Sequence, residues 1–264
     1  MADRLETGFD PETPEDDTVL RRFLVGYGTW METVAGHAGR RFLRTENFVA
    51  LDQGSPDFIS NHAVILRPLE SAHAEHVAAE LLGFFGDAPG GPFAVFDPWP
   101  VPALPGLEVG GFPPFMLRPV GAPAPAPPPG LDVAEVASTA ELADYERVIV
   151  EGYPLEALQP WQPGCLVQES ALEIPGWRFW VGRIDGEPVA ASAAIAVGGL
   201  NYVEMVATMA AARGHGYGEA VTWRATAADP EYPAILVASD PGRPVYERMG
   251  YLPLFRFAFL TGTR

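Results

Sequence analysis

The chain has 264 residues, 48% of them apolar, a formal net charge of -17 and a single cysteine, Cys165. This length and apolar content suit one large or two ordinary domains with a buried core. The charge, without a Lys/Arg stripe, argues against nucleic acid as a ligand. No apolar stretch approaches the ~20 residues of a membrane-spanning helix. One cysteine excludes an internal disulfide and a zinc site built on cysteine pairs.

The N-terminal half predicts an α/β domain of its own, at residues 19–118. Residues 1–18 are acidic and poor in apolar side chains, so we expect a flexible acidic tail. This start is the reverse of a signal peptide, and we expect a cytoplasmic protein. Apolar positions between residues 18 and 35 recur at helical spacing. Shorter runs predict a helix at 74–85 and strands at 47–51, 63–66, 93–96 and 115–117.

A proline-rich segment at residues 119–130 predicts a semi-rigid linker before a second domain, because repeated proline removes backbone donors and favours polyproline II geometry. After it, Ser138 and Glu141 have the spacing of a helix capping box. Asp185-Gly186, between two β-rich runs, predicts a tight hairpin turn. The elements expected in residues 131–264 are strand 131–136, helix 138–150, strands 178–184, 188–195 and 202–208, helix 218–227, strand 234–238, helix 243–249 and strand 254–260.

The strand at 202–208 runs into the loop Arg213-Gly214-His215-Gly216-Tyr217-Gly218, which opens into a helix. A glycine-rich loop of this kind presents free backbone N–H groups and the positive end of a helix dipole, which suits a phosphate group. The loop does not match the dinucleotide-binding motif Gly-x-Gly-x-x-Gly/Ala, because Glu219 stands where the last Gly or Ala is required. The loop does not match the P-loop motif of NTPases either, because that motif requires a lysine and the segment contains none.

The pattern Arg/Gln-x-x-Gly-x-Gly/Ala is matched by Arg213, Gly216 and Gly218. A second segment matches in Tyr246 and Gly250, but it has Ser239, Gly242 and Tyr251 where Asn, Ala and Phe are usual. With these two motifs, residues 131–260 resemble the GNAT superfamily of acyl-CoA-dependent N-acyltransferases. The fold class implied is a mixed α/β GNAT fold in the C-terminal half. We interpret the N-terminal half, which lacks the loop motif, as a degenerate, non-catalytic GNAT-like domain.

The resemblance implies that acetyl-CoA is the cosubstrate and that the acceptor is a primary amine of a small molecule or a protein. Tyr246 matches the tyrosine that returns a proton to the leaving thiolate, with a purely packing role as the alternative. Glu204, on the strand beside the reaction centre, is the candidate base; ordered water or a solvent-facing role are its alternatives. The residues implied in CoA binding are Met205, Val206, Ala207, Thr208, Arg213, Gly214, His215, Gly216, Tyr217, Gly218 and Ser239.

The acceptor is expected between the first helix of this domain and the hairpin. Candidate residues there are aromatic rings and carboxylates that suit a cationic amine, with ordinary core and surface roles as the alternative: Glu151, Tyr153, Trp161, Glu169 and Trp177. No metal is expected, because His73 and His76 have a compatible spacing but no visible third ligand. Two alternatives stay open: a sensor that binds acyl-CoA without turnover, and a homodimer.

Overall fold

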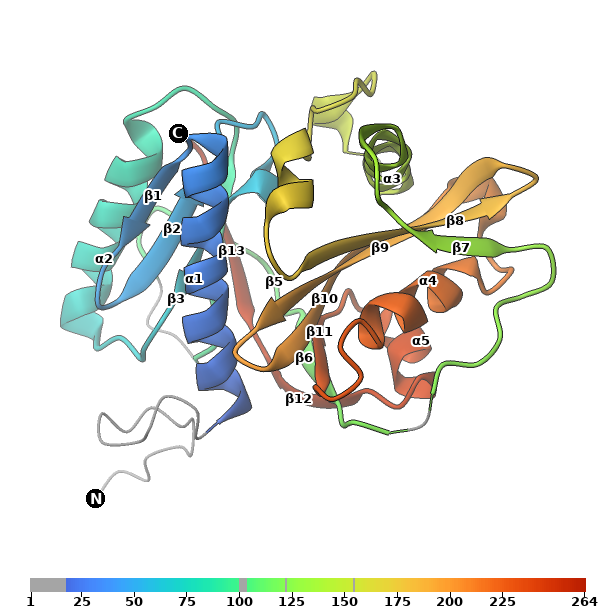
Figure 1. Ribbon diagram of the computed structural model, residues 1–264. Coiled ribbons are helices and arrows are strands. Elements are labelled where there is room, and N and C mark those ends of the chain that lie inside the picture. Colours follow the sequence, from blue (N-terminus) through green and yellow to red (C-terminus); the bar gives the residue numbers. More distant parts are fainter. Residues whose placement is uncertain (1–17, 100–103, 122, 154) are drawn as a thin grey trace. The chain divides into compact units, whose positions relative to one another are not determined.

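The computed structural model describes residues 18–99, 104–121, 123–153 and 155–264, and the expected acidic tail lies almost entirely outside them. The chain divides into two compact units: one extends up to Phe112 and includes Arg256–Arg264, and the other is Pro113–Phe255 (Figure 1). Among the helices of the described residues, none is long and apolar enough to cross a membrane.

The first unit contains a six-stranded sheet with the strand order β1-β2-β3-β4-β13-β5. Helix α1 packs on β1 and β2. Thr18 caps α1 by accepting a hydrogen bond from Arg21 N at 3.1 Å, and Gly39 ends the helix in the left-handed conformation. The elements are α1 (Val19–Ala38), β1 (Arg41–Arg44), β2 (Phe48–Asp52), η1 (Phe58–Ser60), β3 (Asn61–Ile65), α2 (Ser71–Gly86), β4 (Phe93–Asp97), β5 (Glu108–Gly111) and β13 (Ala258–Gly262).

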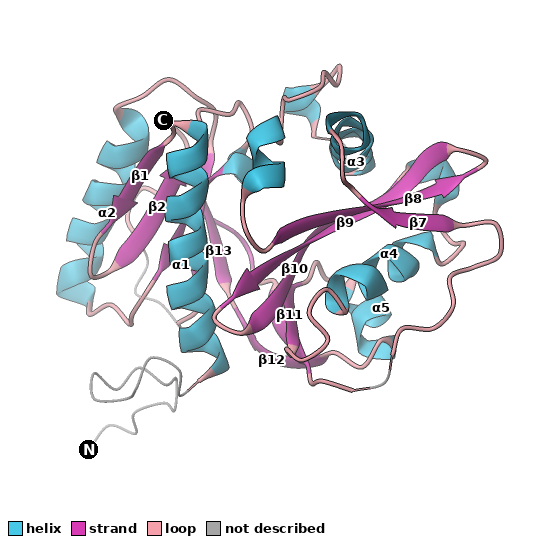
Figure 2. Cartoon of the chain, in the orientation of Figure 1, coloured by secondary structure: helices cyan, strands magenta, loops and turns pink. Residues whose placement is uncertain are grey.

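The second unit contains a seven-stranded sheet with the strand order β12-β6-β11-β10-β9-β8-β7 (Figure 2). Its strands are β6 (Pro114–Arg118), β7 (Asp132–Glu135), β8 (Trp177–Ile184), β9 (Glu187–Val197), β10 (Leu200–Thr208), β11 (Ala234–Val237) and β12 (Leu252–Arg256). Its helices are α3 (Thr139–Gly152), α4 (Tyr217–Thr226) and α5 (Arg243–Arg248), with single turns η2 (Glu156–Leu158), η3 (Glu169–Glu173) and η4 (Ala210–Ala212).

Helices α3 and α4 cover opposite faces of this sheet. On β9, the Ser192 hydroxyl donates to Val221 O of α4 at 2.7 Å. The next residue, Ala193, faces the other way and is paired with Phe179 of β8. Phe179 in turn contacts Tyr145 of α3, with ring centroids 4.9 Å apart. The central strands β8 and β9 are therefore covered on both faces.

Two local predictions are confirmed in detail. Ser138 is the N-cap of α3, its Oγ accepting from Glu141 N at 3.3 Å and donating to Glu141 Oε2 at 2.9 Å. Asp185 and Gly186, with φ values of 50° and 85°, form the turn between β8 and β9. Positive φ at both residues is what a tight hairpin turn requires.

The strands near both ends of the second unit differ from the linear division expected from the sequence. Strand β6, expected in the N-terminal domain, pairs with β11 in the seven-stranded sheet. The strand expected at 254–260 is two strands: β12 lies in that sheet, whereas β13 pairs with β4 and β5 in the other. The proline-rich segment 119–130 therefore connects two strands of one sheet, and does not link two domains. Short apolar runs cannot specify which distant strand they pair with.

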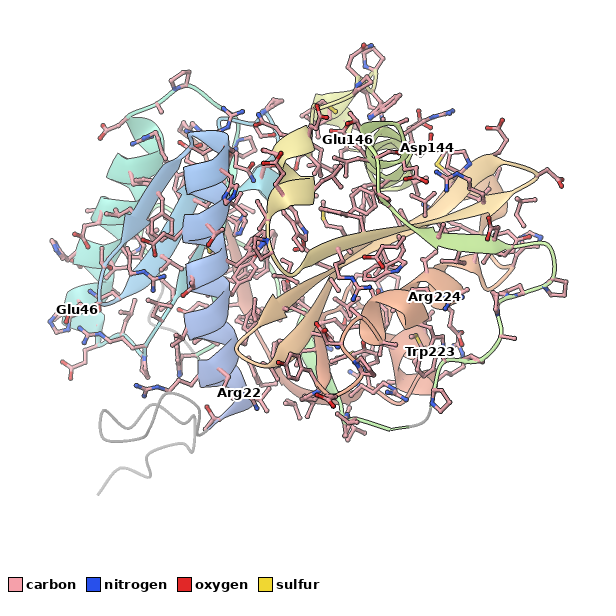
Figure 3. The ribbon with its side chains drawn as sticks, in the orientation of Figure 1. Arg22, Glu46, Asp144, Glu146, Trp223 and Arg224 are labelled. Carbon is pink, nitrogen blue, oxygen red and sulfur yellow. The ribbon has the colours of Figure 1, made fainter. Side chains whose placement is uncertain are left out.

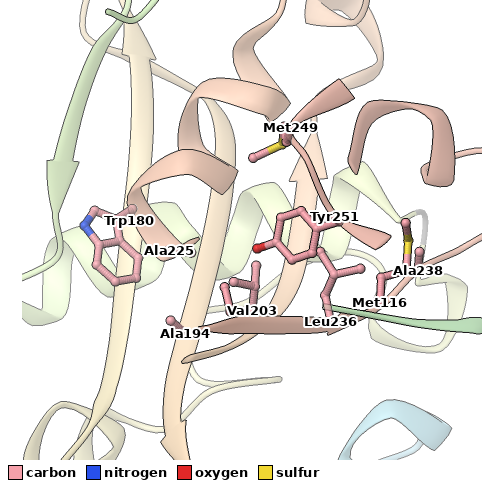
Figure 4. Packing of buried hydrophobic residues seen from close by; sticks show 10 residues of the cluster. Met116, Trp180, Ala194, Val203, Ala225, Leu236, Ala238, Met249 and Tyr251 are labelled. Atoms are coloured by element: carbon pink, nitrogen blue, oxygen red, sulfur yellow. The ribbon is translucent and has the colours of Figure 1, made fainter. Parts of the chain in front are cut away.

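The core beneath α4 and α5 includes the β6 residue Met116, which is fully buried beside Tyr251 and Met249 (Figure 4). Beside this core, the Arg118 guanidinium lies 4.6 Å from the Trp223 ring (Figure 3 labels Trp223) and donates to Met249 O at 2.9 Å. Strand β6 is thus part of this hydrophobic core as well as of the sheet.

Candidate functional site

The site begins where β10 and β11 separate. Their parallel ladder pairs Asn201–Val203 with Ala234–Leu236, and β10 then continues to Thr208. On its other side, β10 stays paired with β9 as far as Thr208. A bulge interrupts this pairing between Glu204 and Ala207, and Met205 has a φ of 51°. Backbone that extends beyond its ladder can pair with an extended ligand that carries amide groups, as an added strand does.

The glycine-rich loop follows this strand end. Gly214 and Gly216 have φ values of 82° and 80°, which side chains other than glycine rarely adopt. Gly216 is the N-cap of α4 and leaves the first-turn N–H groups of the helix without a side-chain cap. Gly218 packs so closely that a Cβ there would lie 2.7 Å from Thr208 Oγ1. The loop thus holds the N-terminus of α4 tightly against the end of β10, a geometry suited to an anion.

The side chains of this loop point to backbone groups and to each other. Arg213 donates to Gly152 O at 2.8 Å and to Thr208 O at 3.3 Å, so it joins the ends of α3 and β10. The His215 and Tyr217 rings are stacked with centroids 5.4 Å apart. The side chains of Arg213, His215 and Tyr217 are therefore engaged within the protein.

Glu204 is the centre of a cluster of aromatic side chains on the α3 side of the sheet. It accepts a hydrogen bond from Trp177 Nε1 at 3.1 Å, and burial raises the pKa of its carboxyl to about 8 against the opposing effect of that bond. Burial, and then the nearby Glu204 charge, raise the pKa of Tyr145 and Tyr202. A carboxyl group with a pKa near neutrality can accept a proton in a reaction and return it to water.

Tyr153 lies at the bulge. It is 42% exposed as a residue, yet the surroundings of its phenol raise its pKa, first by burial and then through Tyr246 and Glu204. The Val206 N–H opposes this shift by hydrogen bonding to the phenol oxygen. Residues from three elements thus lie close enough to influence one another: Tyr153 after α3, Glu204 on β10 and Tyr246 on α5.

Tyr246 and Ser239 have distinct positions. Tyr246 is partly buried against the core, 6.0 Å from the Tyr251 ring, and burial raises its pKa to about 12, so it holds its proton at neutral pH. Ser239 is exposed, and its Oγ accepts from Gly242 N at 3.1 Å. The serine thus caps the turn that leads into α5, while its hydroxyl proton can still be donated.

The five expected acceptor residues separate into two groups. Trp177 and Tyr153 lie at Glu204, as described above. Trp161 instead donates to Glu146 at 3.2 Å. The carboxylates of Glu151 and Glu169 bind Arg147 and Thr139, respectively. Tertiary structure therefore brings only two of the five to Glu204.

Sequence reasoning missed Glu146 on α3, which Figure 3 labels. Glu146 is 1% exposed and accepts from the backbone N of Gly164 at 2.7 Å, Leu166 at 2.5 Å and Val167 at 2.9 Å, besides Trp161. These bonds fix the loop between η2 and η3 to α3. A Glu among apolar positions of a predicted helix face was the available signal, because a buried carboxylate requires donors.

No metal centre is found in the part of the chain that the structure describes: no group of three His, Cys, Asp or Glu side chains there could hold an ion. Of the two histidines at metal-like spacing, His76 lies 3.7 Å from Glu80 on the surface of α2.

Comparison with solved structures identifies the fold. No protein-family model matches the sequence, and no curated protein matches it significantly. A GCN5-related N-acetyltransferase from Kribbella flavida is similar with a TM-score of 0.61 and 22% identity over 89% of this chain and 95% of that one. A putative acetyltransferase of the GNAT family from Novosphingobium aromaticivorans has a TM-score of 0.58 and 18% identity, over 93% of this chain and 96% of that one. A tandem GNAT protein from the clavulanic acid biosynthesis pathway has a TM-score of 0.54 and 14% identity, over 82% of this chain and 79% of that one. The chain has the GNAT fold, and its similarity to a tandem GNAT protein extends over both units.

Proposed function

We propose that this protein is an N-acetyltransferase that moves the acetyl group of acetyl-CoA to a primary amine. The observation that carries the proposal is the separation of β10 from β11 directly before the Gly214–Gly218 loop. The part of β10 beyond its ladder with β11 suits the amide groups of pantetheine, and the N-terminus of α4 suits the pyrophosphate. The loop has glycine at two positions with positive φ, Gly214 and Gly216, and at Gly218, which packs against Thr208.

The reaction assigned to this site is direct transfer. The neutral amine nitrogen attacks the thioester carbonyl carbon, the C–N bond forms, and the C–S bond breaks as the thiolate leaves. Glu204, or water next to it, accepts the proton that the amine loses. Tyr246 donates its phenol proton to the sulfur and regains one from solvent. The pKa values of about 8 and about 12 suit these roles: Glu204 accepts a proton in its ionised form, which is a minor fraction at neutral pH and grows as the pH approaches 8, whereas the Tyr246 phenol still carries its proton.

The test uses the full chain in two assays: calorimetric titration with acetyl-CoA, and release of free thiol in the presence of a panel of primary amines. The sequence contains no lysine, so side-chain self-acetylation of lysine cannot contribute to the signal. We expect binding and amine-dependent thiol release. Binding without release for any amine assigns the protein instead as an acyl-CoA sensor, and absence of binding overturns both functions.

A further inference from the structure

The bulge of β10 turns one backbone N–H out of the sheet. The ladder with β11 has already ended there, and the ladder with β9 is interrupted between Glu204 and Ala207, so Val206 is paired in neither of them. The bend is made by Met205, whose φ of 51° lies in the left-handed region that residues other than glycine seldom adopt. The Val206 N–H instead donates to the phenol oxygen of Tyr153. Strained backbone that takes a donor out of a ladder is typical of a functional site.

The fold holds the end of α3 against this bulge. Tyr153 directly follows α3, and Gly152 before it packs so closely on β10 that a Cβ there would lie 3.0 Å from the Ala207 Cβ. Arg213 donates to Gly152 O at 2.8 Å and to Thr208 O at 3.3 Å, so it joins the same two elements. The backbone of Tyr153 is therefore fixed next to the bulge.

The phenol of Tyr153 lies where the proposed reaction needs the thioester carbonyl. The carbonyl carbon binds both the attacking nitrogen and the departing sulfur, so in the roles proposed above it must lie within reach of Glu204 and of Tyr246. The Tyr153 phenol is close enough to both of these groups for each to raise its pKa. Tyr153 is also 42% exposed, whereas Glu204 and Tyr246 are half-buried. Its side chain can therefore turn toward solvent while its backbone stays in place.

We propose that in the free protein the Tyr153 phenol occupies the place of the thioester carbonyl, and that acetyl-CoA displaces it on binding. This inference rests on the proposed function. One N–H forms one well-aligned hydrogen bond, so the phenol and carbonyl oxygens compete for the Val206 donor. After displacement, the Val206 N–H donates to the carbonyl oxygen and to the oxyanion that forms from it during transfer.

The contact between Tyr153 and Val206 is thus autoinhibitory, and it acts on acetyl-CoA but not on CoA. CoA carries a thiol in place of the thioester and has no carbonyl at this position, so it leaves the Tyr153 bond intact. The bond therefore lowers the affinity for the substrate acetyl-CoA and leaves the affinity for the product CoA unchanged.

The experiment titrates the full chain by calorimetry with acetyl-CoA and with CoA, in wild type and in Tyr153→Phe, so that the four dissociation constants form a cycle. Phe keeps the ring and removes the oxygen that competes for the Val206 N–H. We expect Tyr153→Phe to bind acetyl-CoA about 3- to 10-fold more tightly than wild type, which corresponds to one hydrogen bond that no longer has to be broken. Its affinity for CoA should stay within about 2-fold of wild type, because CoA breaks no such bond.

The matched control is Tyr232→Phe, because Tyr232 is 41% exposed and lies in the turn after α4. This variant should change neither affinity. Equal changes for acetyl-CoA and CoA in Tyr153→Phe, or weaker binding of acetyl-CoA, would overturn the inference and leave the acetyltransferase proposal standing. If wild type binds neither ligand, the proposed function is overturned together with the inference.

Discussion

Replacing Glu204 by Gln should stabilise the protein increasingly as the pH rises. Burial raises the pKa of Glu204 from an ordinary 4.5 to about 8. The folded state therefore holds a proton that the unfolded state releases between these values, so the free energy of unfolding falls as pH rises through this window. Gln cannot ionise, and its amide oxygen can still accept from Trp177. The energetic cost of ionising a buried carboxyl group is therefore absent from the variant at every pH.

The magnitude follows from the shift. The rise of the Glu204 pKa from 4.5 to about 8 would lower the free energy of unfolding by about 5 kcal/mol above pH 8 if it were fully expressed. Because Glu204 is partly accessible, solvent screens part of this energetic cost. We therefore expect Glu204→Gln to be more stable than wild type by roughly 2 to 3 kcal/mol at pH 8.5, and the difference in stability to be smallest at pH 5. The groups facing Glu204 are Trp177, Tyr145, Tyr153 and Tyr202, and the three phenols remain protonated throughout, because their pKa values are raised.

The assay is urea denaturation at pH 5, 7 and 8.5, with unfolding of Pro113–Phe255 followed by hydrogen exchange of β9 and β10 peptides. The matched control is Glu187→Gln, an exposed carboxylate on the same sheet. The difference in the free energy of unfolding between wild type and Glu204→Gln could instead be the same at all three pH values. Burial would then not raise the pKa of the carboxyl group, and its assignment as a base with a near-neutral pKa would be refuted.

Three further predictions concern the loop, the acid and the buried carboxylate. Gly218→Ala should destabilise the protein by about 1 to 3 kcal/mol, because its Cβ would lie 2.7 Å from Thr208 Oγ1. Adding Thr208→Ala should restore most of that loss in thermal melts, and purely additive losses would contradict the clash. Tyr246→Phe should lower turnover by ~10²–10⁴ with an unchanged acetyl-CoA dissociation constant; unaltered turnover would make Tyr246 a packing residue. Glu146→Ala should destabilise the loop by about 3 to 5 kcal/mol and speed amide exchange at Leu166 and Val167, whereas unchanged exchange would show that its four hydrogen bonds do not hold the loop.

The strand arrangement shows that the second unit needs β6, which precedes the proline-rich segment. A fragment starting at Gly130 would omit β6, which pairs with β11 over Phe115–Arg118 and contributes Met116 to the core. Such a fragment would expose an edge of β11 and leave a hole beside Tyr251. Binding studies therefore need the full chain.

Local sequence determined the elements whose signals lie within a few residues. The capping box at Ser138, the Asp185-Gly186 turn and the glycines of the α4 loop each specify a backbone geometry through their own side chains, or through the lack of one. The placement of the glycine-rich loop between a strand and a helix followed from the same short-range rules. The GNAT fold was implied by the resemblance of the loop motif and of the Ser239–Tyr251 segment to that superfamily, and the structural comparisons support it.

Only tertiary structure decided which distant segments meet. Strand β13 is paired with β4 across more than half of the chain, and Arg264 binds Asp52 from 212 positions away. Likewise, Trp177 reaches Glu204 through the pairing of β8 and β10 with β9, and the resulting burial raises the pKa of that carboxyl. An apolar run encodes that it will be buried but carries no label for its partner, and a carboxyl group acquires its pKa only from the groups that folding places around it.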